Sequence, residues 1–587
     1  MSLSVDKALR KAQSHLKNGK LAEAESLYKQ VLSKFPKNKK AIQGYHKLKA
    51  GITSKGSLSS EPPQEQIDEL IRFYNLGRFE EVLLKAKPLS KFFPKASILL
   101  NLLGSSNMAL LNYNEALENY NSALKMEPKN ADFLHNMGNA LSGIGDIMGA
   151  IGFYEKAQKK MPDDPEVLYK IGLNLQKIGA LNESLNSYKQ AVKIKPDYAE
   201  AFMNMGNILG EKGELNSAID SYKQALKIKP DYVEAYSNLG LALKDKGDLE
   251  GAIDSYKQAL KIKPDYAEAY NNMGIALKGT GDLTAAIDSY KQAIQIKPNY
   301  AEVYSNMGNA LTDKGDLDAA IDSYKQAINI RPDYAEVYNN LGLAFKEKGE
   351  LDAAKKCFET VLKKDPEDAL GARMRLASLT QKGIPSKTPI HYMNKFYKSK
   401  SRSWGNDSQY RGHLMIKNAV ENSFKERVKI DILDLGCGTG TLADFLMPYT
   451  RTLCGVDLSP DMLKEAAQTG LYDFLHEKDI EIYLKETPDQ YDMVIAAAVM
   501  IHFFDLEHVF SLIIDKLRPN GKLIFSVFEA PEEEIELNSF LMYSHSDKYI
   551  TSLAERLNCK VCYRKKDIHE YHPEPINGLA YVFERYK

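Results

Sequence analysis

The sequence predicts an all-α superhelical solenoid followed by an α/β domain of the doubly wound class. Prolines from Pro94 to Pro366 recur at a constant interval of 34 residues, which is typical of arrays of helix–turn–helix units. From residue 383 onward this period ends, and short apolar runs alternate with amphipathic segments. A glycine-rich stretch, ILDLGCGTGTLADF at 432–445, lies in this second part and indicates a loop that holds a nucleotide-like ligand.

Composition limits the classes of function. The chain has 587 residues, which predicts two or more domains, and Lys+Arg equals Asp+Glu at 78 each. This balance argues against bulk attraction to nucleic acid or anionic membranes. The first residues lack an apolar signal core, and no apolar run is long enough for a membrane span. Five cysteines, an odd number, favour a reducing compartment, so we expect a cytoplasmic protein.

The repeating unit is clearest at 199–232, AEAFMNMGNILGEKGELNSAIDSYKQALKIKPDY. Phe202 and Leu209 belong to the apolar stripe of a first helix, which Gly213 ends. Tyr222 belongs to the stripe of a second helix, which Pro230 ends because proline cannot continue a helix. The unit closely resembles the tetratricopeptide repeat (TPR), and the resemblance covers most of residues 4–380. It implies a superhelical solenoid of ten units, in which each unit covers the apolar face of its neighbour.

The domain boundaries follow from where the repeat is interrupted. Residues 1–50 are predicted to form N-terminal TPR helices, and 51–64, GITSKGSLSSEPPQ, a linker. Residues 65–382 are predicted to form the main TPR solenoid, which ends in a capping helix at EDALGARMRLASLTQK. Residues 383–587 then form the α/β domain.

Asparagines recur at one phase of the repeat, at a position that faces the concave groove in TPR superhelices. Their carboxamides offer both donors and acceptors to the backbone of an extended peptide. Alternatively, asparagine is simply common at this position in the repeat family, and both interpretations stay open. We therefore expect a protein or peptide partner in the groove. The asparagines are Asn136, Asn204, Asn238, Asn272, Asn306 and Asn340, with Lys170 interrupting the row.

The α/β domain begins with the strand that leads into the glycine-rich loop. VKIDILDL, TLCGVDL, YDMVIAAAV and GKLIFSVFE are predicted strands, apolar enough to be buried in a parallel sheet. LADFLMPY, SPDMLKEAAQ, LEHVFSLIIDKL and SDKYITSLAERLN are predicted helices, and CKVCYRK and GLAYVFERY are further strands. Asp457 ends the second strand, 21 residues after Gly436, where a carboxylate can accept the hydroxyls of a ribose. The loop therefore fits a nucleoside with a small charged tail.

Two ligand classes match the glycines. Gly438, Gly440 and Ala443 satisfy the dinucleotide pattern G-x-G-x-x-G/A, which predicts a nicotinamide cofactor. The pattern Asp434-x-Gly-x-Gly-x-Gly instead resembles the first motif of class I S-adenosylmethionine-dependent methyltransferases. GVDLSPDML, HEKDI, DQYDMVIAAAVMIHFFDL and LRPNGKLIFS resemble later parts of that family, in family order. The domain is most similar to ubiquinone and menaquinone biosynthesis methyltransferases, and the whole chain to predicted bacterial methyltransferases that carry TPRs.

This resemblance implies a Rossmann-like fold with seven strands, and S-adenosylmethionine as cofactor. Asp434 would hold the methionine amino group and Asp457 the ribose, while Asp479 and Ile480 would contact the adenine. Backbone and apolar contacts to the cofactor would come from Gly436, Cys437, Gly438, Gly440, Leu458 and Ala497. No metal site is expected, because Cys559-x-x-Cys562 lacks a second pair and His569 and His572 are too few.

Catalytic residues are less well defined. His502, after the fourth strand, is a candidate to accept a substrate proton, or it packs against Phe503. His545, Tyr410 and Arg411 are weaker candidates for the lid or the substrate pocket. An Asn-Pro-Pro-Tyr motif is absent, which counts against DNA adenine and protein glutamine as substrates. PEEEIE at 531–536 is interpreted as the start of a solvated helix.

The predicted function is that of an S-adenosylmethionine-dependent methyltransferase whose solenoid binds or positions a protein partner or substrate. One alternative is an interaction scaffold with an inactive cofactor domain, and another is an NAD-dependent oxidoreductase. The methyl acceptor is not readable from the sequence, because variable loops build that pocket.

Overall fold

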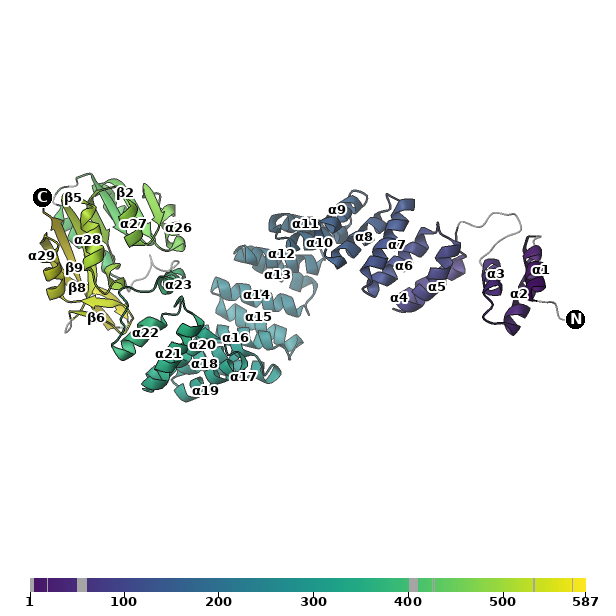
Figure 1. Ribbon diagram of the computed structural model, residues 1–587, viewed down its shortest axis with the longest axis horizontal. Helices are drawn as coiled ribbons and strands as arrows, with labels where there is room; N and C mark the ends of the chain where they lie inside the picture. The colour runs from purple at the N-terminus through teal and green to yellow at the C-terminus, as the bar shows by residue number, and fades with distance from the viewer. Residues whose placement is uncertain are drawn as a thin grey trace. The chain divides into compact units, whose positions relative to one another are not determined.

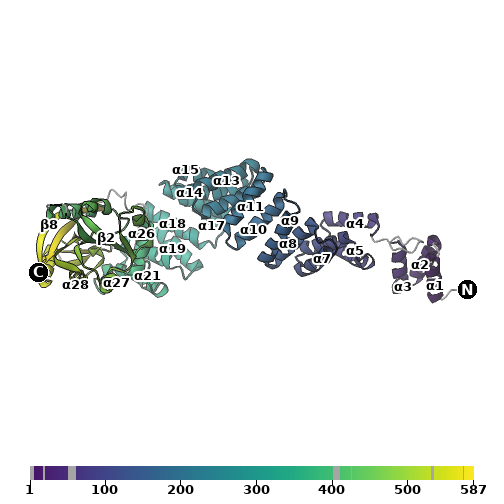
Figure 2. The same ribbon diagram turned by 90° about the horizontal axis from the view of Figure 1, so that it is seen from above.

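The computed structural model describes residues 5–17, 20–49, 61–400, 410–424, 426, 428–530, 534–572 and 574–586 (Figures 1 and 2). The chain divides into two compact units, Met1–Ala276 and Leu277–Lys587. Most of the predicted linker at 51–64 lies outside the described residues, and its last residue begins a helix. The predicted boundary after residue 382 lies inside the second unit and stays a prediction.

The first unit is entirely helical in its described residues. A first group of helices comprises α1 (Val5–Lys17), α2 (Leu21–Lys34) and α3 (Lys39–Lys49). The main series comprises α4 (Gln64–Asn75), α5 (Phe79–Phe92), α6 (Ser97–Ala109), α7 (Tyr113–Met126), α8 (Ala131–Ile144), α9 (Ile147–Gln158), α10 (Pro165–Lys177), α11 (Leu181–Ile194), α12 (Ala199–Glu211), α13 (Leu215–Ile228), α14 (Val233–Lys246), α15 (Leu249–Ile262) and α16 (Ala267–Gly279), whose end extends past the unit boundary.

A glycine on the first helix of a pair receives a tyrosine ring from the second helix. A Cβ atom added at Gly206 would lie only 2.5 Å from Cε1 of Tyr222, so a larger residue would push α12 and α13 apart. Tyr222 is buried, and its hydroxyl donates to Asn207 Oδ1 at 2.9 Å. The same notch recurs at Gly104, Gly138, Gly172, Gly240 and Gly308. Glycine on the first helix therefore allows the two helices of a pair to pack closely.

The second unit begins with helices of the same kind and continues into the α/β domain. Its solenoid helices are α17 (Leu283–Ile296), α18 (Ala301–Lys314), α19 (Leu317–Ile330), α20 (Ala335–Glu347), α21 (Leu351–Lys364) and the predicted capping helix α22 (Ala372–Thr380). The remaining helices are α23 (Ile390–Lys400), α24 (Gly412–Ser423), α25 (Ala443–Leu446), α26 (Pro460–Gln468), α27 (Ile480–Glu486), α28 (Glu507–Asp515) and α29 (Asp547–Arg556).

The sheet has the strand order β3-β2-β1-β4-β5, with β9 antiparallel to β5 and β8 antiparallel to β9. The first five strands are parallel to one another. These seven strands match the predicted fold class, and two short strands, β6 and β7, extend the sheet beyond the end of β5. The strands are β1 (Ile430–Leu435), β2 (Thr450–Asp457), β3 (Phe474–Glu477), β4 (Tyr491–Ala496), β5 (Leu517–Glu529), β6 (Ile535–Leu537), β7 (Tyr543–His545), β8 (Cys559–His572) and β9 (Glu574–Arg585).

Two predicted helix segments differ from the structure. The interpretation of 531–536 as a helix start is wrong for Ile535 and Glu536, which pair with β7, while 531–533 lie outside the described residues. The helix predicted at LADFLMPY is reduced to the four residues of α25, followed by a 3-10 turn at Met447–Tyr449. A proline at 448 ends it, since the first residue of a helix tolerates proline and its interior does not.

Helices cover both faces of the sheet. Leu433, Val494 and Phe525 pack on one face with α28 and α29, whereas Ile432, Ile495 and Ile524 pack on the other face with α24 and α25. Adjacent strand residues point to opposite faces, so these strands must be apolar throughout. The sheet is therefore doubly wound, as predicted, and its core lies in two layers.

The capping helix packs on the α/β domain within this unit. Met374 and Ala377 of α22 share one apolar cluster with Leu541 and Tyr543. The Tyr543 hydroxyl donates to the carbonyl oxygen of Pro385 at 2.6 Å, just before α23. The segment that follows the solenoid is thereby held against β7.

Candidate functional site

The glycine-rich loop turns sharply at the carboxyl end of β1. The N–H of Gly436 donates to the carbonyl oxygen of Val456 at 2.7 Å, and Gly440 N–H donates to the carbonyl of Cys437 at 3.0 Å. Gly436 has a φ of +67°, a conformation that residues with a side chain rarely adopt. The turn exposes backbone to a cavity at the ends of β1, β2 and β4, where doubly wound folds bind ligands.

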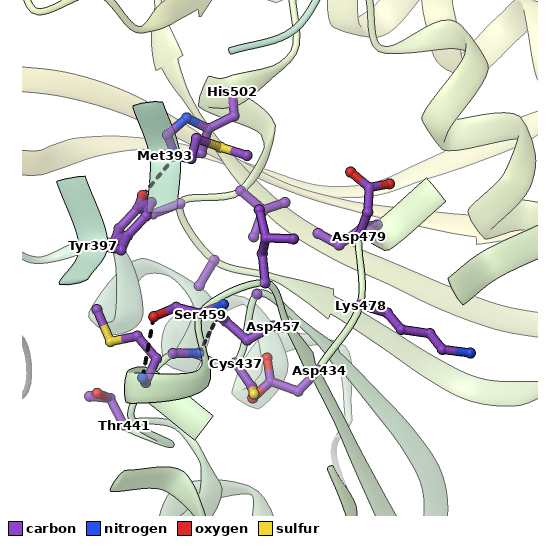
Figure 3. A pocket seen from close by; sticks show the side chains of 18 of the residues that line it. Met393, Tyr397, Asp434, Cys437, Thr441, Asp457, Ser459, Lys478, Asp479 and His502 are labelled. Carbon is purple, nitrogen blue, oxygen red and sulfur yellow. Dashed lines mark hydrogen bonds between the residues drawn. The ribbon is translucent and has the colours of Figure 1, made fainter. Parts of the chain in front are cut away.

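Two carboxylates lie close to this loop (Figure 3). Asp434 is 2% exposed, and its Oδ2 accepts the Tyr472 hydroxyl at 2.8 Å. Asp457 accepts Gly438 N–H on Oδ2 at 2.9 Å and Ser459 N–H on Oδ1 at 2.8 Å. Burial raises the pKa of Asp434 to about 7, and the nearby Asp457 carboxylate adds to this shift. Burial likewise raises the pKa of Asp457, against the opposing effect of its backbone donors.

Asp479 is the N-cap residue that immediately precedes α27, shortly after the end of β3. Its Oδ1 accepts the N–H of Glu481 at 2.9 Å, so the side chain caps the helix. Its Oδ2 lies 3.3 Å from Nζ of Lys387, which also contacts Glu481 at 2.5 Å. Ile480 follows as the first residue of α27, where helix N–H groups have no acceptor inside the helix.

His502 is buried in the 3-10 turn that follows β4 and is hydrogen-bonded through both ring nitrogens. Nε2 lies 2.7 Å from the Tyr397 hydroxyl, and Nδ1 lies 3.3 Å from Thr388 Oγ1. Burial lowers the pKa of His502 to about 4, so the ring is neutral at neutral pH. The His502 ring thus makes polar contacts with the segment before β1.

That segment supplies a wall of the cavity that the sequence analysis did not assign to the site. Lys387, Met393, Asn394 and Tyr397 line the cavity, and so does His413 of α24. Among the described residues, Asn394 Oδ1 and His413 Nδ1 are buried atoms without a hydrogen-bond partner. A ligand with N–H or O–H groups would satisfy them. The signal available in the sequence was only that YMNKFYKSKSRSWGNDSQYRGHL resembles the lead-in of the family, and 401–409 of it lie outside the described residues.

Most predicted cofactor residues line this one cavity. They are Asp434, Gly436, Cys437, Gly438, Asp457, Leu458, Asp479, Ile480 and Ala497, and the catalytic candidate His502 lines it too. Gly440 does not: a Cβ there would lie 3.2 Å from Tyr472 and 3.5 Å from Ala466, so this glycine serves packing against α26.

Of the weaker candidates for the lid or the substrate pocket, one lines the cavity and the others make contacts elsewhere. Tyr410 lines the cavity. Arg411 is fixed by its N–H, which donates to the His569 carbonyl at 2.7 Å. His545 lies elsewhere, with Nε2 3.0 Å from the carbonyl oxygen of Phe504. Ala443, part of the dinucleotide pattern, is buried in the core beneath the sheet.

The asparagine row of the solenoid is half-buried and largely engaged between repeats. The amide of Asn136 donates to Asn101 at 3.0 Å, and that of Asn238 to Asn207 at 2.9 Å. Asn204 donates to the Tyr169 hydroxyl at 3.1 Å, and Asn340 donates to Asn309 at 3.0 Å. Asn272 accepts a weaker contact from Asn271 at 3.4 Å. Asn136, Asn204, Asn238 and Asn340 therefore link successive first helices.

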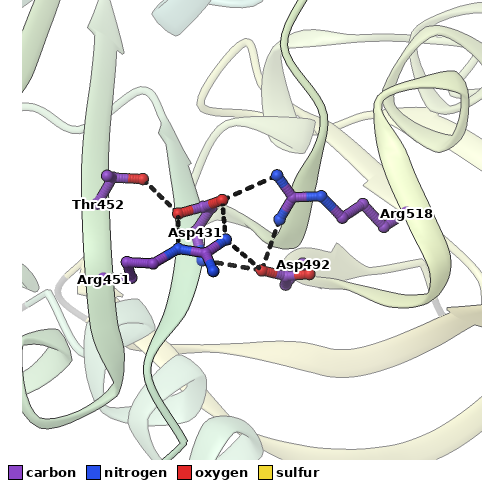
Figure 4. A network of polar contacts seen from close by, with 5 residues as sticks. All are labelled: Asp431, Arg451, Thr452, Asp492 and Arg518. Carbon is purple, nitrogen blue, oxygen red and sulfur yellow. Dashed lines mark hydrogen bonds and ion pairs between the residues drawn. The ribbon is translucent and has the colours of Figure 1, made fainter.

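A second polar cluster lies at the opposite, amino end of the strands (Figure 4). Asp431 is paired with Arg451 and with Arg518, which also contacts Asp492 at 2.7 Å. Arg451 holds the pKa of Asp431 well below its usual range. Because this network joins β1, β2, β4 and β5 far from the loop, it stabilises the sheet and is not part of the cavity.

In the part of the chain that the structure describes, no group of three or more His, Cys, Asp or Glu side chains could hold a metal ion. No helix in the same residues is long and apolar enough to cross a bilayer.

Comparison with known families places both parts of the chain. Residues 408–560 match a family described as methyltransferase domain. Residues 8–38 and 335–368 match tetratricopeptide repeat families. A further TPR repeat family matches at 109–145, 175–213, 206–247, 240–281, 280–312 and 308–349.

Curated relatives with methyltransferase names match about a fifth of this chain. Malonyl-[acyl-carrier protein] O-methyltransferase of Acetivibrio thermocellus is 28% identical over 132 residues, 21% of this chain and 46% of that protein. The mitochondrial ubiquinone biosynthesis O-methyltransferase of Bos taurus is 28% identical over 123 residues, 20% of this chain and 33% of that protein. The enzyme of that name from Pseudomonas fluorescens (strain SBW25) is 26% identical over 139 residues, 22% of this chain and 60% of that protein. The chain thus spans between a third and three fifths of these relatives' lengths.

Solved structures resemble the solenoid. A crystal structure of MamA is 34% identical, with a TM-score of 0.27 over 28% of this chain and 97% of that one. YrrB, described as a TPR protein with an unusual peptide-binding site, is 22% identical, with a TM-score of 0.30 over 33% of this chain and 97% of that one. The family matches and the strand order agree: this chain combines tetratricopeptide repeats with a methyltransferase domain in its C-terminal part.

Proposed function

We propose that the C-terminal domain is an S-adenosylmethionine-dependent methyltransferase and that the solenoid binds a protein partner or substrate. One observation carries the proposal: Asp434, Asp457 and Asp479, from the ends of three neighbouring strands, line a single cavity beside the glycine-rich loop. The domain match supports the reaction class, and the methyltransferase names of the relatives agree with it.

The polar atoms of the cavity suit this cofactor. S-adenosylmethionine presents hydrogen-bond donors along its length, namely an ammonium group, two ribose hydroxyls and an adenine amino group. The cavity presents acceptors: three carboxylates, and the unpartnered Asn394 Oδ1 and His413 Nδ1. A carboxylate has about four acceptor positions, so Asp457 retains capacity for ribose hydroxyls after binding two backbone N–H groups. When bound, the cofactor supplies an electrophilic methyl group on a sulfonium.

The chain's own residues then orient the reactants. Gly436 and Cys437 are held by the carbonyl of Val456, which fixes the loop backbone that lies along the ligand. Gly438 and Ser459 fix both oxygens of Asp457, so the ribose clamp needs no rearrangement. Methyl transfer gains much of its rate from such positioning of donor and acceptor.

A nicotinamide cofactor is less well supported. The dinucleotide pattern depends on a helix N-terminus that binds the pyrophosphate. Here the helix after the loop, α25, has only four residues, so its dipole is weak.

Calorimetry of the full chain tests the cofactor proposal, with S-adenosylmethionine and NADH titrated separately. The full chain is needed because the capping helix packs on β7. We expect micromolar binding of S-adenosylmethionine alone, lost in Asp457→Ala and unchanged in Asp444→Ala, an exposed aspartate outside the cavity. Binding of NADH alone, or of neither ligand, would contradict the proposal, the second outcome favouring an inactive scaffold.

The partner proposal concerns a polar groove in the first unit. It is lined by side chains of α6 to α10, among them Asn136, Asn139, Lys170, Asn174 and Lys177. Selection of extended peptides from a random display library against the full chain would test it. We expect the selected peptides to lose binding to Asn139→Ala or Lys170→Ala, and to keep it with Lys223→Ala, on an exposed face of α13. Peptides that bind all three variants equally would place the partner elsewhere.

A further inference from the structure

Three residues form a continuous hydrogen-bonded chain at the edge of the cavity. Thr388 Oγ1 contacts His502 Nδ1 at 3.3 Å, and His502 Nε2 contacts the Tyr397 hydroxyl at 2.7 Å (Figure 3). The backbone holds this arrangement, because Thr388 N–H donates to the His502 carbonyl at 2.9 Å and Lys387 pairs with Phe503. Tyr397 and His502 both line the cavity.

The distances indicate which atoms carry protons. A neutral imidazole has one N–H donor and one acceptor nitrogen. Hydrogen bonds given by hydroxyl groups are typically about 0.2 Å shorter than those given by N–H groups. The 2.7 Å contact therefore fits donation from the Tyr397 hydroxyl to Nε2, and the longer contact fits donation from Nδ1–H to Thr388. His502 Nε2 is then the proton acceptor at the end of a Tyr–His pair.

The surroundings of this pair disfavour an anionic acceptor. Of the described residues that line the cavity, the lysines are Lys387 and Lys478, and both have acidic partners: Lys387 pairs with Asp479 and Glu481, and Lys478 with Glu486. Figure 3 shows Lys478 and Asp479 on the side of the cavity away from Tyr397 and His502. Figure 3 shows Met393 beside the pair. Met393, Ala498 and Val499, which also line the cavity, offer no positive charge. Burying an unpaired carboxylate there would be costly, whereas a neutral hydroxyl is accommodated.

Building on the proposed methyltransferase function, we propose that Tyr397 and His502 form a proton relay for methyl transfer to a neutral hydroxyl group. The acceptor oxygen forms the new C–O bond as the C–S bond of the sulfonium donor breaks and its electron pair stays on sulfur. The hydroxyl proton passes to the Tyr397 oxygen, and the Tyr397 proton passes to His502 Nε2. The positive charge thus moves from the sulfonium to the imidazolium. Tyr397 is the catalytic residue that touches the acceptor, and His502 is a positioning residue that acts through it.

Burial of His502 fits this role. Its low pKa, about 4, keeps the ring neutral and able to accept a proton throughout the physiological range. An oxonium formed on the acceptor is a far stronger acid than an imidazolium, so a weak base suffices. The charged or titratable groups that act on the pair are Glu570 on His502, and Asp457, Tyr410, Tyr392 and Glu570 on Tyr397. The Glu570 carboxylate stabilises the imidazolium that forms.

Methylation by the full chain tests the acceptor class. Labelled S-adenosylmethionine is offered with catechol, benzoate or aniline, and its binding is measured separately by calorimetry. We expect transfer to catechol alone, with kcat lowered by about 10²-fold or more in Tyr397→Phe, as for loss of acid–base catalysis. Lys395→Ala, exposed on the same helix and outside the cavity, should keep wild-type kcat. Transfer to benzoate or aniline, no transfer to catechol, or an undiminished Tyr397→Phe would overturn the relay.

A second measurement needs no turnover. Nitrogen-15 NMR of imidazole-labelled protein, assigned with His502→Gln, reports which ring nitrogen carries the proton. We expect Nδ1–H and an acceptor Nε2 in the wild type, and a changed Nε2 shift in Tyr397→Phe. A proton on Nε2 in the wild type would also overturn the relay. If the wild-type protein does not bind S-adenosylmethionine, the proposed function itself is refuted. Failure of the relay and failure of the proposed function are therefore distinguishable.

Discussion

Gly436→Ala is the substitution whose effect the structure defines most closely. Gly436 has φ of +67°, and a Cβ there would overlap Cγ2 of Val499. Gly470, after α26, has almost the same φ, +66°, but a Cβ there would meet no atom within 4 Å. The two glycines therefore share the backbone cost of alanine and differ only in the steric overlap.

The magnitudes follow from these two contributions. Alanine in the left-handed region costs about 1–2 kcal/mol, which is all that Gly470→Ala should lose. Overpacking adds about 1–3 kcal/mol, so Gly436→Ala should lose about 2–5 kcal/mol. Val499→Ala removes the overlapping atom and leaves Val499 Cβ at 3.7 Å, an ordinary contact distance. The double variant should therefore recover most of the overpacking cost, as a favourable coupling of about 1–3 kcal/mol.

Urea unfolding measures these differences, followed by fluorescence of Trp404, the single tryptophan of the chain. Calorimetric affinity for S-adenosylmethionine provides a second readout, since Gly436 and Val499 line the cavity and Gly470 does not. Equal losses in Gly436→Ala and Gly470→Ala, or strictly additive effects in the double variant, would refute the steric argument.

Three further predictions concern charge and packing. Because burial raises the pKa of Asp434 to about 7, binding of a cationic donor should release a proton below that pH, so affinity should rise from pH 5 to 8. Calorimetry in buffers of different ionisation enthalpy checks this, and Asp434→Asn should remove the pH dependence. Asp431→Asn should lower the free energy of unfolding by about 1–2 kcal/mol at pH 7. This loss should shrink progressively as the pH falls below about 4, because the unfolded chain then binds a proton at Asp431 before the folded state, with its depressed pKa, does so; urea titrations at pH 7 and pH 3 would show this. Tyr543→Ala should speed amide hydrogen exchange in α22, with a loss of about 3–5 kcal/mol, whereas Tyr543→Phe should lose about 1 kcal/mol with the bond to Pro385.

The fold was predictable because its signals are local. The 34-residue period places each helix pair, and the Gly206–Tyr222 notch needs only residues 16 positions apart. The central residues of the parallel strands are apolar in succession, as both faces of the sheet are covered. β6 was missed because three residues become a strand only by pairing with β7, and their acidic neighbours favour a helix start by local rules.

The loop side of the site was also predictable, since its glycines and carboxylates follow strands in a recognisable order. The opposite wall was not. Tyr397 and His502 are separated by 105 residues and Lys387 and Asp479 by 92, and no spacing in the sequence relates them. The left-handed Gly436 was predictable from the motif, but its contact with Val499 depends on how β4 ends.

The placement of these missed residues links the two kinds of domain. Thr388 and Tyr397 belong to the segment that leaves the capping helix, and Tyr543 fixes the start of that segment at Pro385. The same side chain packs on Met374 of α22. A displacement of α22 would therefore act directly on the wall that holds His502, without passing through the core of the sheet. In this arrangement the end of the solenoid is connected directly to the site, because the chain that leaves it supplies both hydrogen-bond partners of His502.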